Sequence, residues 1–250
     1  MHRFVLAEFN THRAFSRNSA SSRAIPVENR LKAFIQDPAW PVAWPREQPG
    51  MQGGSELFGD DERDARVLLQ EIHDDTARRI RQYIDKHPDK GTRLHKSLLN
   101  RLMEPFQWHT VIVSSTEWGN FFAQRCHPDA QPEIRAAAEA MRDVFYTSMP
   151  TPVGYGDWHT PYVDGQDIGG SMLDAEEARM VSAARCARVS YLTHDGKRDP
   201  AEDLRLYERL VSANPPHWSP LEHVATPTTG NALGNFKGWH QLRHWSDHDH

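Results

Sequence analysis

The stretch from residue 11 to residue 23 constrains the fold most, because its side chains cannot build a hydrophobic core. It contains three arginines, one histidine, four serines and one asparagine, and Phe15 is its single large apolar residue. Nearly every side chain is a hydrogen-bond donor, and no carboxylate balances the positive charge. Such a set suits an anion with several oxygens, such as a phosphate or a nucleotide. Composition alone leaves a solvated loop or a disordered basic arm as the alternative.

The position of this stretch favours a binding site. Residues 4–9 read as a β-strand that passes directly into it, and many phosphate sites are built where a strand runs into a helix. If part of the stretch is helical, four side chains share one face: His12, Ser16, Ser19 and Arg23. Because the chain begins inside the predicted strand, we also expect residues upstream of Met1 to be missing.

Length and charge limit the partners. A chain of 250 residues can bury a sizeable core, and without a clear internal boundary we expect a single domain over residues 1–250. The net charge of -5 disfavours a nucleic-acid polymer as partner, so the basic stretch suits a small anionic ligand. The sequence contains neither a run of about 18 apolar residues nor a signal-peptide layout. We therefore expect a cytoplasmic protein with no membrane partner.

Several familiar chemistries are missing. Cys126 and Cys186 lie far apart, make no metal-ligand spacing and have no nucleophile context. The phosphate-binding and nucleotide-binding glycine motifs and the Gly-x-Ser-x-Gly elbow are also missing. We expect no functional metal. An enzyme of this sequence acting on a nucleotide base would need a cofactor for the difficult step.

Periodicity predicts a helix-rich chain. Helices are expected over 27–35, 61–86, 92–103, 116–125, 129–146, 175–191 and 200–212, and a strand over 110–113. Pro105 should end the third helix, and Asp129 and Asp199 should cap the helices that follow them. Ser219 looks like the start of a further helix. Two stretches rich in proline and glycine and one polar tail complete the chain: 37–60, 147–173 and 245–250.

Three arginines stand out in otherwise ordinary helices: Arg101, Arg125 and Arg188. Such residues are more often surface or ion-paired groups than ligand contacts. Arg125 is the strongest candidate, because it follows Asn120 and two phenylalanines on an expected buried face. His223, in the first turn after Ser219, is more often a structural histidine than a ligand.

The opening stretch resembles the signature of the flavin-dependent thymidylate synthases, Arg-His-Arg-x-x-Ser-x-Asn-x-x-Ser-x-Arg. Six of its seven fixed places match, at His12, Arg13, Ser16, Asn18, Ser21 and Arg23, and Thr11 stands where the first arginine is expected. Further segments that are similar to family motifs lie at 100–105 with Thr110, 120–125, 130–135, 187–191 and 219–223.

The order of these motifs differs from that of the usual family member. There the equivalents of 187–191 and 219–223 come before the signature, whereas here they follow it. The resemblance therefore implies a circular permutation of the family fold. That fold is α+β, with a mixed or antiparallel sheet flanked by helices, and residues 238–244 resemble the strand that leads into the signature.

The resemblance also implies a reaction, which is the reductive methylation of dUMP to dTMP. Methylenetetrahydrofolate would supply the carbon, FAD would carry the hydride and NADPH would reduce the flavin. The family works as a homotetramer with sites at subunit interfaces, so we expect the same assembly here.

Residue roles follow from the matched positions. Arg125 and Ser21 are the expected catalytic residues, and the substrate contacts are expected from Ser21, Arg23, Arg101, Arg125 and Glu8. The cofactor contacts are expected from His12, Arg13, Ser16, Asn18, Asn120, Ser190 and His223.

Thr11, Ser114 and Thr116 replace family residues that contact the flavin, and these departures leave two alternatives open. One is a relative that acts on another pyrimidine nucleotide or performs hydroxymethylation. The other is a non-catalytic nucleotide-binding oligomer that has lost its flavin.

Overall fold

The computed structural model describes residues 1–165, 167, 173–191, 199–230 and 235–246. Its contacts divide the chain into two compact units. Unit 1 consists of Met1–Thr11, Ser21–His109 and Gly119–Ser148, and unit 2 of His12–Ala20, Thr110–Trp118 and Met149–His250. The donor-rich stretch is therefore shared, with its middle in unit 2 and its two ends in unit 1. The prediction of a single domain stays a prediction.

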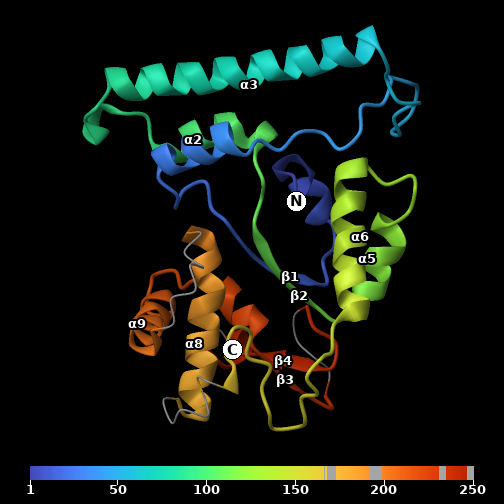
Figure 1. The fold of residues 1–250 in the computed structure, drawn as a ribbon. Coiled ribbons are helices and arrows are strands. Elements are labelled where there is room, and N and C mark those ends of the chain that lie inside the picture. Colours follow the sequence, from blue (N-terminus) through green and yellow to red (C-terminus); the bar gives the residue numbers. More distant parts are fainter. Residues whose placement is uncertain (166, 168–172, 192–198, 231–234, 247–250) are drawn as a thin grey trace. The chain divides into compact units, whose positions relative to one another are not determined.

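The regular elements that the structure describes in unit 1 are all helices (Figure 1). In chain order these are η1 (Arg3–Val5), α1 (Leu6–Phe9), α2 (Val27–Gln36), α3 (Asp60–Lys86), η2 (Lys90–Thr92), α4 (Lys96–Leu99), η3 (Asn100–Phe106), α5 (Trp118–Arg125) and α6 (Pro132–Thr147), where η marks a 3₁₀ helix. One core cluster joins α2 and α3 to α4 and η3, through Leu31, Phe34, Ile80, Met103 and their neighbours.

The predicted strand over 4–9 is wrong, because these residues form η1 and α1. Val5 and Phe9 are both buried, and a spacing of four places them on one side of a helical turn. In a strand the two side chains would also share a face, so local periodicity did not distinguish the two conformations. In the helical conformation Phe9 contacts Phe121 on α5, with ring centroids 5.7 Å apart.

Three other features of unit 1 differ from expectation. The helix predicted over 92–103 is divided into η2, α4 and η3, because the His95 side chain accepts from the Ser97 amide and so starts a helix at Lys96. Pro105 lies inside η3 and does not end it. Asp129 does not cap α6, whose N-cap is Gln131 and whose first residue is Pro132.

Unit 2 contains two small antiparallel sheets. β1 (Phe15–Ser19) pairs with β2 (Val111–Ser115), and β3 (Ala225–Pro227) pairs with β4 (Trp239–Gln241). The middle of the donor-rich stretch is thus a strand, so His12, Ser16, Ser19 and Arg23 do not share a helical face. Along β1, Ser16 and Asn18 are buried and Arg17 and Ser19 are half-buried, which is the period of two expected of a strand.

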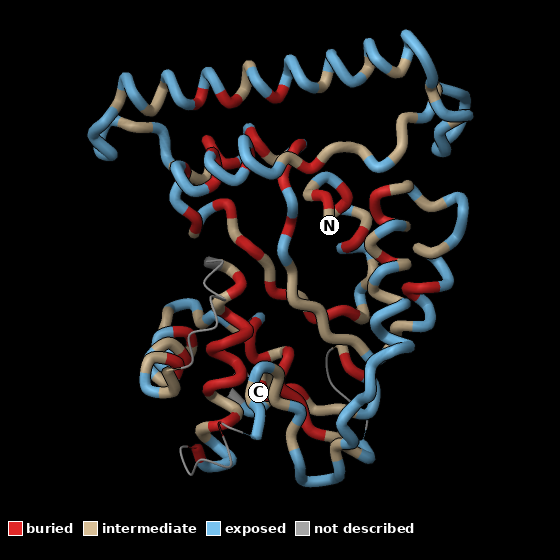
Figure 2. The backbone as a smooth tube through the Cα atoms, viewed as in Figure 1, coloured by how far each residue is buried: buried red, intermediate tan, exposed pale blue. Residues whose placement is uncertain are grey.

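Helices complete unit 2, namely α8 (Ala175–Arg188), η4 (Val189–Tyr191), α9 (Pro200–Val211), η5 (Ser219–His223) and α10 (Arg243–Ser246). α8 is buried along most of its length (Figure 2), and its small side chains allow close packing by α9 and η5. Asp199 caps α9 as predicted, since its carboxylate accepts from the Glu202 amide at 3.1 Å. Ser219 does not cap η5, whose N-cap is Trp218.

The predicted α+β class is confirmed, because helices and small antiparallel sheets occur together. The strand pairs are all antiparallel within the described residues, so the mixed sheet is not found there. None of the described helices is long and apolar enough to cross a membrane. The end of the predicted polar tail, 247–250, lies outside the described residues.

Candidate functional site

Asn18 on β1 joins the signature to two later motifs within unit 2. Its Nδ2 donates to the carbonyl oxygen of Cys186 at 2.7 Å. Its Oδ1 accepts from the hydroxyls of Ser190 and Ser219, each at 3.4 Å. Asn18 is buried, so its amide is bonded mainly to the protein itself. It holds both motifs against the signature strand.

Ser16 is fully buried two residues earlier on the same face of β1. Its hydroxyl accepts from Gln241 Nε2 at 2.8 Å and from Asn235 Nδ2 at 3.3 Å. The same Gln241 amide donates to the Glu222 carbonyl oxygen at 2.7 Å. Sequence reasoning did not single out Gln241, and no local pattern marks it, because its partners are far away in the chain.

His223 ends η5 and is fully buried. Its Nδ1 lies 2.9 Å from the hydroxyl of Ser114 on β2, while its Nε2 is buried without a hydrogen-bond partner among the described residues. Burial, with a smaller contribution from His159, lowers the pKa of His223 to about 4. The imidazole is therefore neutral at pH 7, and Nε2 is a buried polar atom that a bound group or a water could satisfy.

This pKa predicts acid sensitivity. An unfolded histidine binds a proton near pH 6.5, whereas folded His223 binds one only near pH 4. Between these values the unfolded state holds more protons, so the free energy of unfolding falls as the pH drops, by about 2 kcal/mol at pH 5. Urea unfolding at pH 7 and pH 5 should show that His223→Gln loses this part of the pH dependence. The exposed His217→Gln should keep it, and equal pH dependence in both variants would contradict the prediction.

The three residues that depart from the family pattern, Thr11, Ser114 and Thr116, all have partners within their own unit. In unit 2 Ser114 bonds His223, and the hydroxyl of Thr116 accepts from the Lys237 amide at 3.2 Å. In unit 1 the hydroxyl of Thr11 accepts from Arg125 Nη2 at 3.1 Å. Each short side chain thus contributes to packing of its own unit.

Arg125 at the end of α5 lies beside the opening helix in unit 1. Its Nη1 donates to Glu8 Oε2 at 3.3 Å, and its Nη2 lies 3.4 Å from the Glu8 carbonyl oxygen. These bonds connect two segments that the family resemblance links to the nucleotide, and they hold the guanidinium, whose side chain stays 20% exposed. The structure therefore brings together Arg125, Glu8 and Thr11, of which the resemblance expects the first two at the substrate.

Ser21, Arg23 and Arg101 belong to a second surface of unit 1. The amide of Asn100 donates to the Ser22 and Ile25 carbonyl oxygens at 2.8 and 3.0 Å, and this fixes the 21–25 turn next to η3. Arg23 and Arg101 are exposed, and neither guanidinium has a hydrogen-bond or ion-pair partner among the described residues. The nearby Glu104 carboxylate accepts from the Ser22 hydroxyl at 2.6 Å and pairs with Arg3 at 2.9 Å, so the guanidinium groups of Arg23 and Arg101 keep their binding capacity for an anion.

The residues expected to hold FAD differ in how accessible they are. Ser16, Asn18 and His223 are buried, and Ser190 is half-buried with its hydroxyl directed at Asn18. Arg13 and Asn120 are exposed, and the half-buried His12 ring stacks on Phe15 with centroids 5.5 Å apart. The exposed side chains are available to a ligand, since Arg13 in unit 2 can neutralise a phosphate and Asn120 in unit 1 offers an amide. The buried set fits a supporting role better than direct contact.

Neither cysteine has the environment of a nucleophile. Cys186 is fully buried, and burial raises its pKa to about 12. Burial also raises the pKa of Cys126, which is half-buried beside Arg125. Because the thiolate is the reactive form, both side chains are protonated and unreactive at pH 7. No cluster of three potential metal ligands occurs in the described part of the chain.

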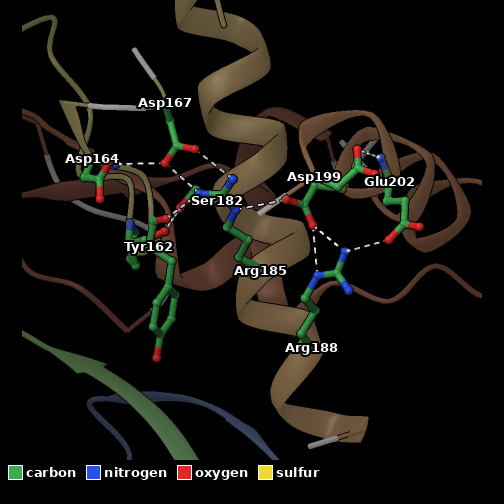
Figure 3. A network of polar contacts seen from close by, with 10 residues as sticks. Tyr162, Asp164, Asp167, Ser182, Arg185, Arg188, Asp199 and Glu202 are labelled. Carbon is green, nitrogen blue, oxygen red and sulfur yellow. Dashed lines mark hydrogen bonds and ion pairs between the residues drawn. The ribbon is translucent and has the colours of Figure 1, made fainter. Parts of the chain in front are cut away.

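A buried ion-pair network on α8 was not predicted (Figure 3). Arg185 donates to both Asp167 oxygens at 2.7 and 2.9 Å and to Asp203 Oδ2 at 2.9 Å. Arg188, from the Ala-Arg-Val-Ser-Tyr motif, donates twice to Asp203 Oδ1, at 2.9 and 2.6 Å. Arg188 is thus ion-paired, the more common role expected of such an arginine. The signal available in the sequence was the spacing of three between the two arginines, which places them on one helical face.

Comparisons with known proteins agree with the signature. The family model described as thymidylate synthase complementing protein matches residues 1–151, which is more than half of the 250 residues. The match includes the signature, the 100–105 segment and Arg125, and it ends before the motifs at 187–191 and 219–223. A search of curated proteins and a search of solved structures each found no match. The chain belongs to the thymidylate synthase complementing protein family, the family of the flavin-dependent thymidylate synthases.

Proposed function

We propose that this protein methylates dUMP reductively to dTMP, with methylenetetrahydrofolate as carbon donor, FAD as hydride carrier and NADPH as reductant of the flavin. The observation that carries the proposal is the contact of Arg125 with Glu8 and Thr11 in unit 1. It joins two segments of a chain whose family makes thymidylate. The contact supports a fixed guanidinium at the place where the family resemblance expects the uracil ring.

Arg125 would act on the base by electrostatics. Methylation at C5 of uracil requires electron density on that carbon, and negative charge then develops on the ring. A positioned guanidinium stabilises such charge without a covalent bond to the protein. Glu8 would keep the guanidinium oriented, and the protonated state of Cys126 supports a mechanism without a thiolate.

The phosphate of dUMP would be held by the other surface of unit 1. Arg23 and Arg101 would neutralise its two charges, and the Ser21 hydroxyl would donate a hydrogen bond to it. In the structure Ser21 Oγ already accepts from the Arg23 amide at 3.2 Å, so the turn is ordered before the ligand binds. We assign Ser21 to positioning of the substrate for catalysis.

Bound FAD would supply the hydride that converts the transferred one-carbon group to a methyl group. His12, Arg13 and Asn120 would hold the flavin nucleotide by direct contacts. Ser16 and Asn18 would support it through the packing of β1, and Ser190 and His223 would lie nearer the flavin and folate rings. The buried Nε2 of His223 supports this assignment, because it lacks a partner among the described residues.

Purified protein tests the proposal directly. We expect a yellow protein with a flavin absorption spectrum, or one that becomes yellow with added FAD, and formation of dTMP from dUMP, methylenetetrahydrofolate and NADPH. A yellow protein that oxidises NADPH without forming dTMP would instead identify a relative with another base or with a hydroxymethylated product. A colourless protein that FAD cannot reconstitute would refute both and leave a non-catalytic nucleotide-binding oligomer.

We further propose that the motif order reflects a circular permutation of the family fold. The contacts of Asn18 with the Cys186 carbonyl oxygen, Ser190 and Ser219 support this, because they pack the late motifs on the signature strand. A circular permutation changes the order of segments along the chain but keeps their neighbours in the folded structure. An experimental structure in which these motifs lie away from β1 would contradict the permutation.

We also propose a homotetramer with sites completed by neighbouring subunits. The resemblance to the family is its support. Light scattering coupled to size-exclusion chromatography would measure the mass in solution, and a monomer of 28.7 kDa would contradict it.

A further inference from the structure

Three polar side chains from one segment of unit 1 hold the turn at 21–25. They follow one another at intervals of four residues, and they are Lys96 of α4 and Asn100 and Glu104 of η3. Residues four apart are neighbours on the surface of a helix, and each of these three contacts the turn. We call them the clamp. None of them is among the residues that the family resemblance assigns to a ligand.

Two members of the clamp bind backbone carbonyl groups of the turn. Lys96 Nζ donates to the Ala24 carbonyl oxygen at 2.8 Å. Asn100 Nδ2 donates to the carbonyl oxygens of Ser22 and Ile25, at 2.8 and 3.0 Å. Asn100 is fully buried, and its Oδ1 has no hydrogen-bond partner among the described residues. A buried oxygen without a partner costs stability, so the orientation of this amide serves the turn.

The third member of the clamp binds a side chain of the turn. Glu104 Oε1 accepts from the hydroxyl of the buried Ser22 at 2.6 Å and pairs with Arg3 Nη2 at 2.9 Å. Arg3 is itself held, because its Nη1 lies 2.6 Å from Nδ1 of the buried His109. Glu104 is thus anchored on the side away from the turn, and Arg3 balances its charge before any anion binds.

The clamp connects the two parts of the proposed phosphate site. Ser21 and Arg23 belong to the turn, whereas Arg101 follows Asn100 on η3. The turn is also closed by its own backbone, since the Ala24 amide donates to the Ser21 carbonyl oxygen at 3.1 Å. A phosphate that takes donors from both parts binds more tightly when the two parts are ordered in advance, because less conformational entropy is lost on binding.

We propose that the clamp is a positioning device for a phosphate monoester. It keeps the 21–25 turn in a fixed position relative to Arg101, so that Ser21 and Arg23 meet the phosphate together with that arginine. The clamp residues act through the turn and not by contact with the ligand. This inference rests on the proposed function, in which the phosphate of dUMP binds at the turn, and it adds the residues that prepare that site.

Ser22→Ala and Glu104→Ala remove the same hydrogen bond from its two sides. Isothermal titration calorimetry of the full chain with dUMP should show a dissociation constant about tenfold higher for either variant. The double variant should bind no more weakly than Glu104→Ala, because one interaction is lost in all three proteins. Glu104→Gln keeps an oxygen that accepts from Ser22 and should bind within about threefold of the unmodified protein. Additive losses in the double variant would overturn this hydrogen bond as the cause.

Inorganic phosphate separates positioning from general destabilisation. As a competitor of dUMP it should lose affinity by the same factor in Glu104→Ala. KM for dUMP should rise about tenfold, while kcat at saturating dUMP stays within about twofold. Glu62→Ala is the matched control, because it removes a carboxylate of similar exposure that pairs with Arg66 on α3, and it should bind dUMP normally.

Failure of the clamp gives a different result from failure of the proposed reaction. A protein that binds dUMP without forming dTMP still reports the clamp through calorimetry, and a tenfold loss in Ser22→Ala and Glu104→Ala would then support it. Unchanged dUMP affinity in both variants would overturn the clamp, whether or not dTMP is formed. A fall in kcat at unchanged KM would also overturn it, because the clamp acts on phosphate binding. A full chain that binds neither dUMP nor inorganic phosphate would overturn the phosphate site and the clamp together.

Discussion

Arg125→Ala is expected to lower kcat for dTMP formation by about 100- to 1000-fold, the usual effect of removing one preorganised group that stabilises transition-state charge. Arg125 is fixed by Glu8 and Thr11 before substrate binds, so its stabilisation of the ring costs little reorganisation. The flavin absorption spectrum should stay unchanged, because the expected flavin contacts are other residues. Single-turnover kinetics with dUMP and reduced enzyme would measure the effect on the chemical step.

Two matched variants make this result specific. Arg135→Ala removes a half-buried arginine on α6 of the same unit, whose guanidinium bonds only the Pro128 carbonyl oxygen in the described contacts, and it should leave kcat within about twofold. Arg125→Lys keeps a charge but loses the forked geometry, so we expect an intermediate loss. If Arg125→Ala and Arg135→Ala have the same kcat, Arg125 does not act on the base.

Asp203→Ala is expected to lower the free energy of unfolding by about 3–5 kcal/mol, the cost of leaving buried charges without their partner. Asp203 is fully buried and accepts hydrogen bonds from both Arg185 and Arg188. Its removal takes away the carboxylate on α9 that Arg185 and Arg188 of α8 share. Urea unfolding followed by circular dichroism would measure the change at pH 7.

A neighbouring carboxylate provides the control. Glu202 precedes Asp203 on α9, but its side chain is 38% exposed and lies 4.0 Å from Arg188. Such a pair contributes at most about 1 kcal/mol, so Glu202→Ala should change stability little. A loss in Asp203→Ala no larger than that in Glu202→Ala would show that burial does not make this network important for stability.

The family and much of the helical structure could be predicted from local patterns. The donor-rich signature needs no tertiary contact to be recognised, since its residue types and spacing are in the sequence itself. The long amphipathic helix α3 follows from its periodicity, and the cap of α9 follows from Asp199 before Pro200. These features depend on residues only a few positions apart, so local physical chemistry is sufficient.

The roles of the individual signature residues could not be predicted from the sequence. Asn18 and Arg13 match the family motif equally well, yet Asn18 is bonded to the Cys186 carbonyl oxygen and Arg13 is exposed. Their difference comes from partners about 170 positions along the chain, and no local pattern encodes them. The same reason explains the missed Gln241, whose amide reaches Ser16 across 225 positions.

The sequence by itself determined the family of this protein, the positions of its long helices and the absence of a thiol with nucleophile spacing. Only the tertiary structure decided that residues 4–9 are helical, that Ser16, Asn18 and His223 are buried in unit 2, and that Arg125 is held by Glu8. It also decided that Tyr162 takes a positive φ, which Arg185 supports from α8. Motif spacing and periodicity are local properties, whereas burial, desolvation and ion pairing depend on residues that folding brings together from distant parts of the chain.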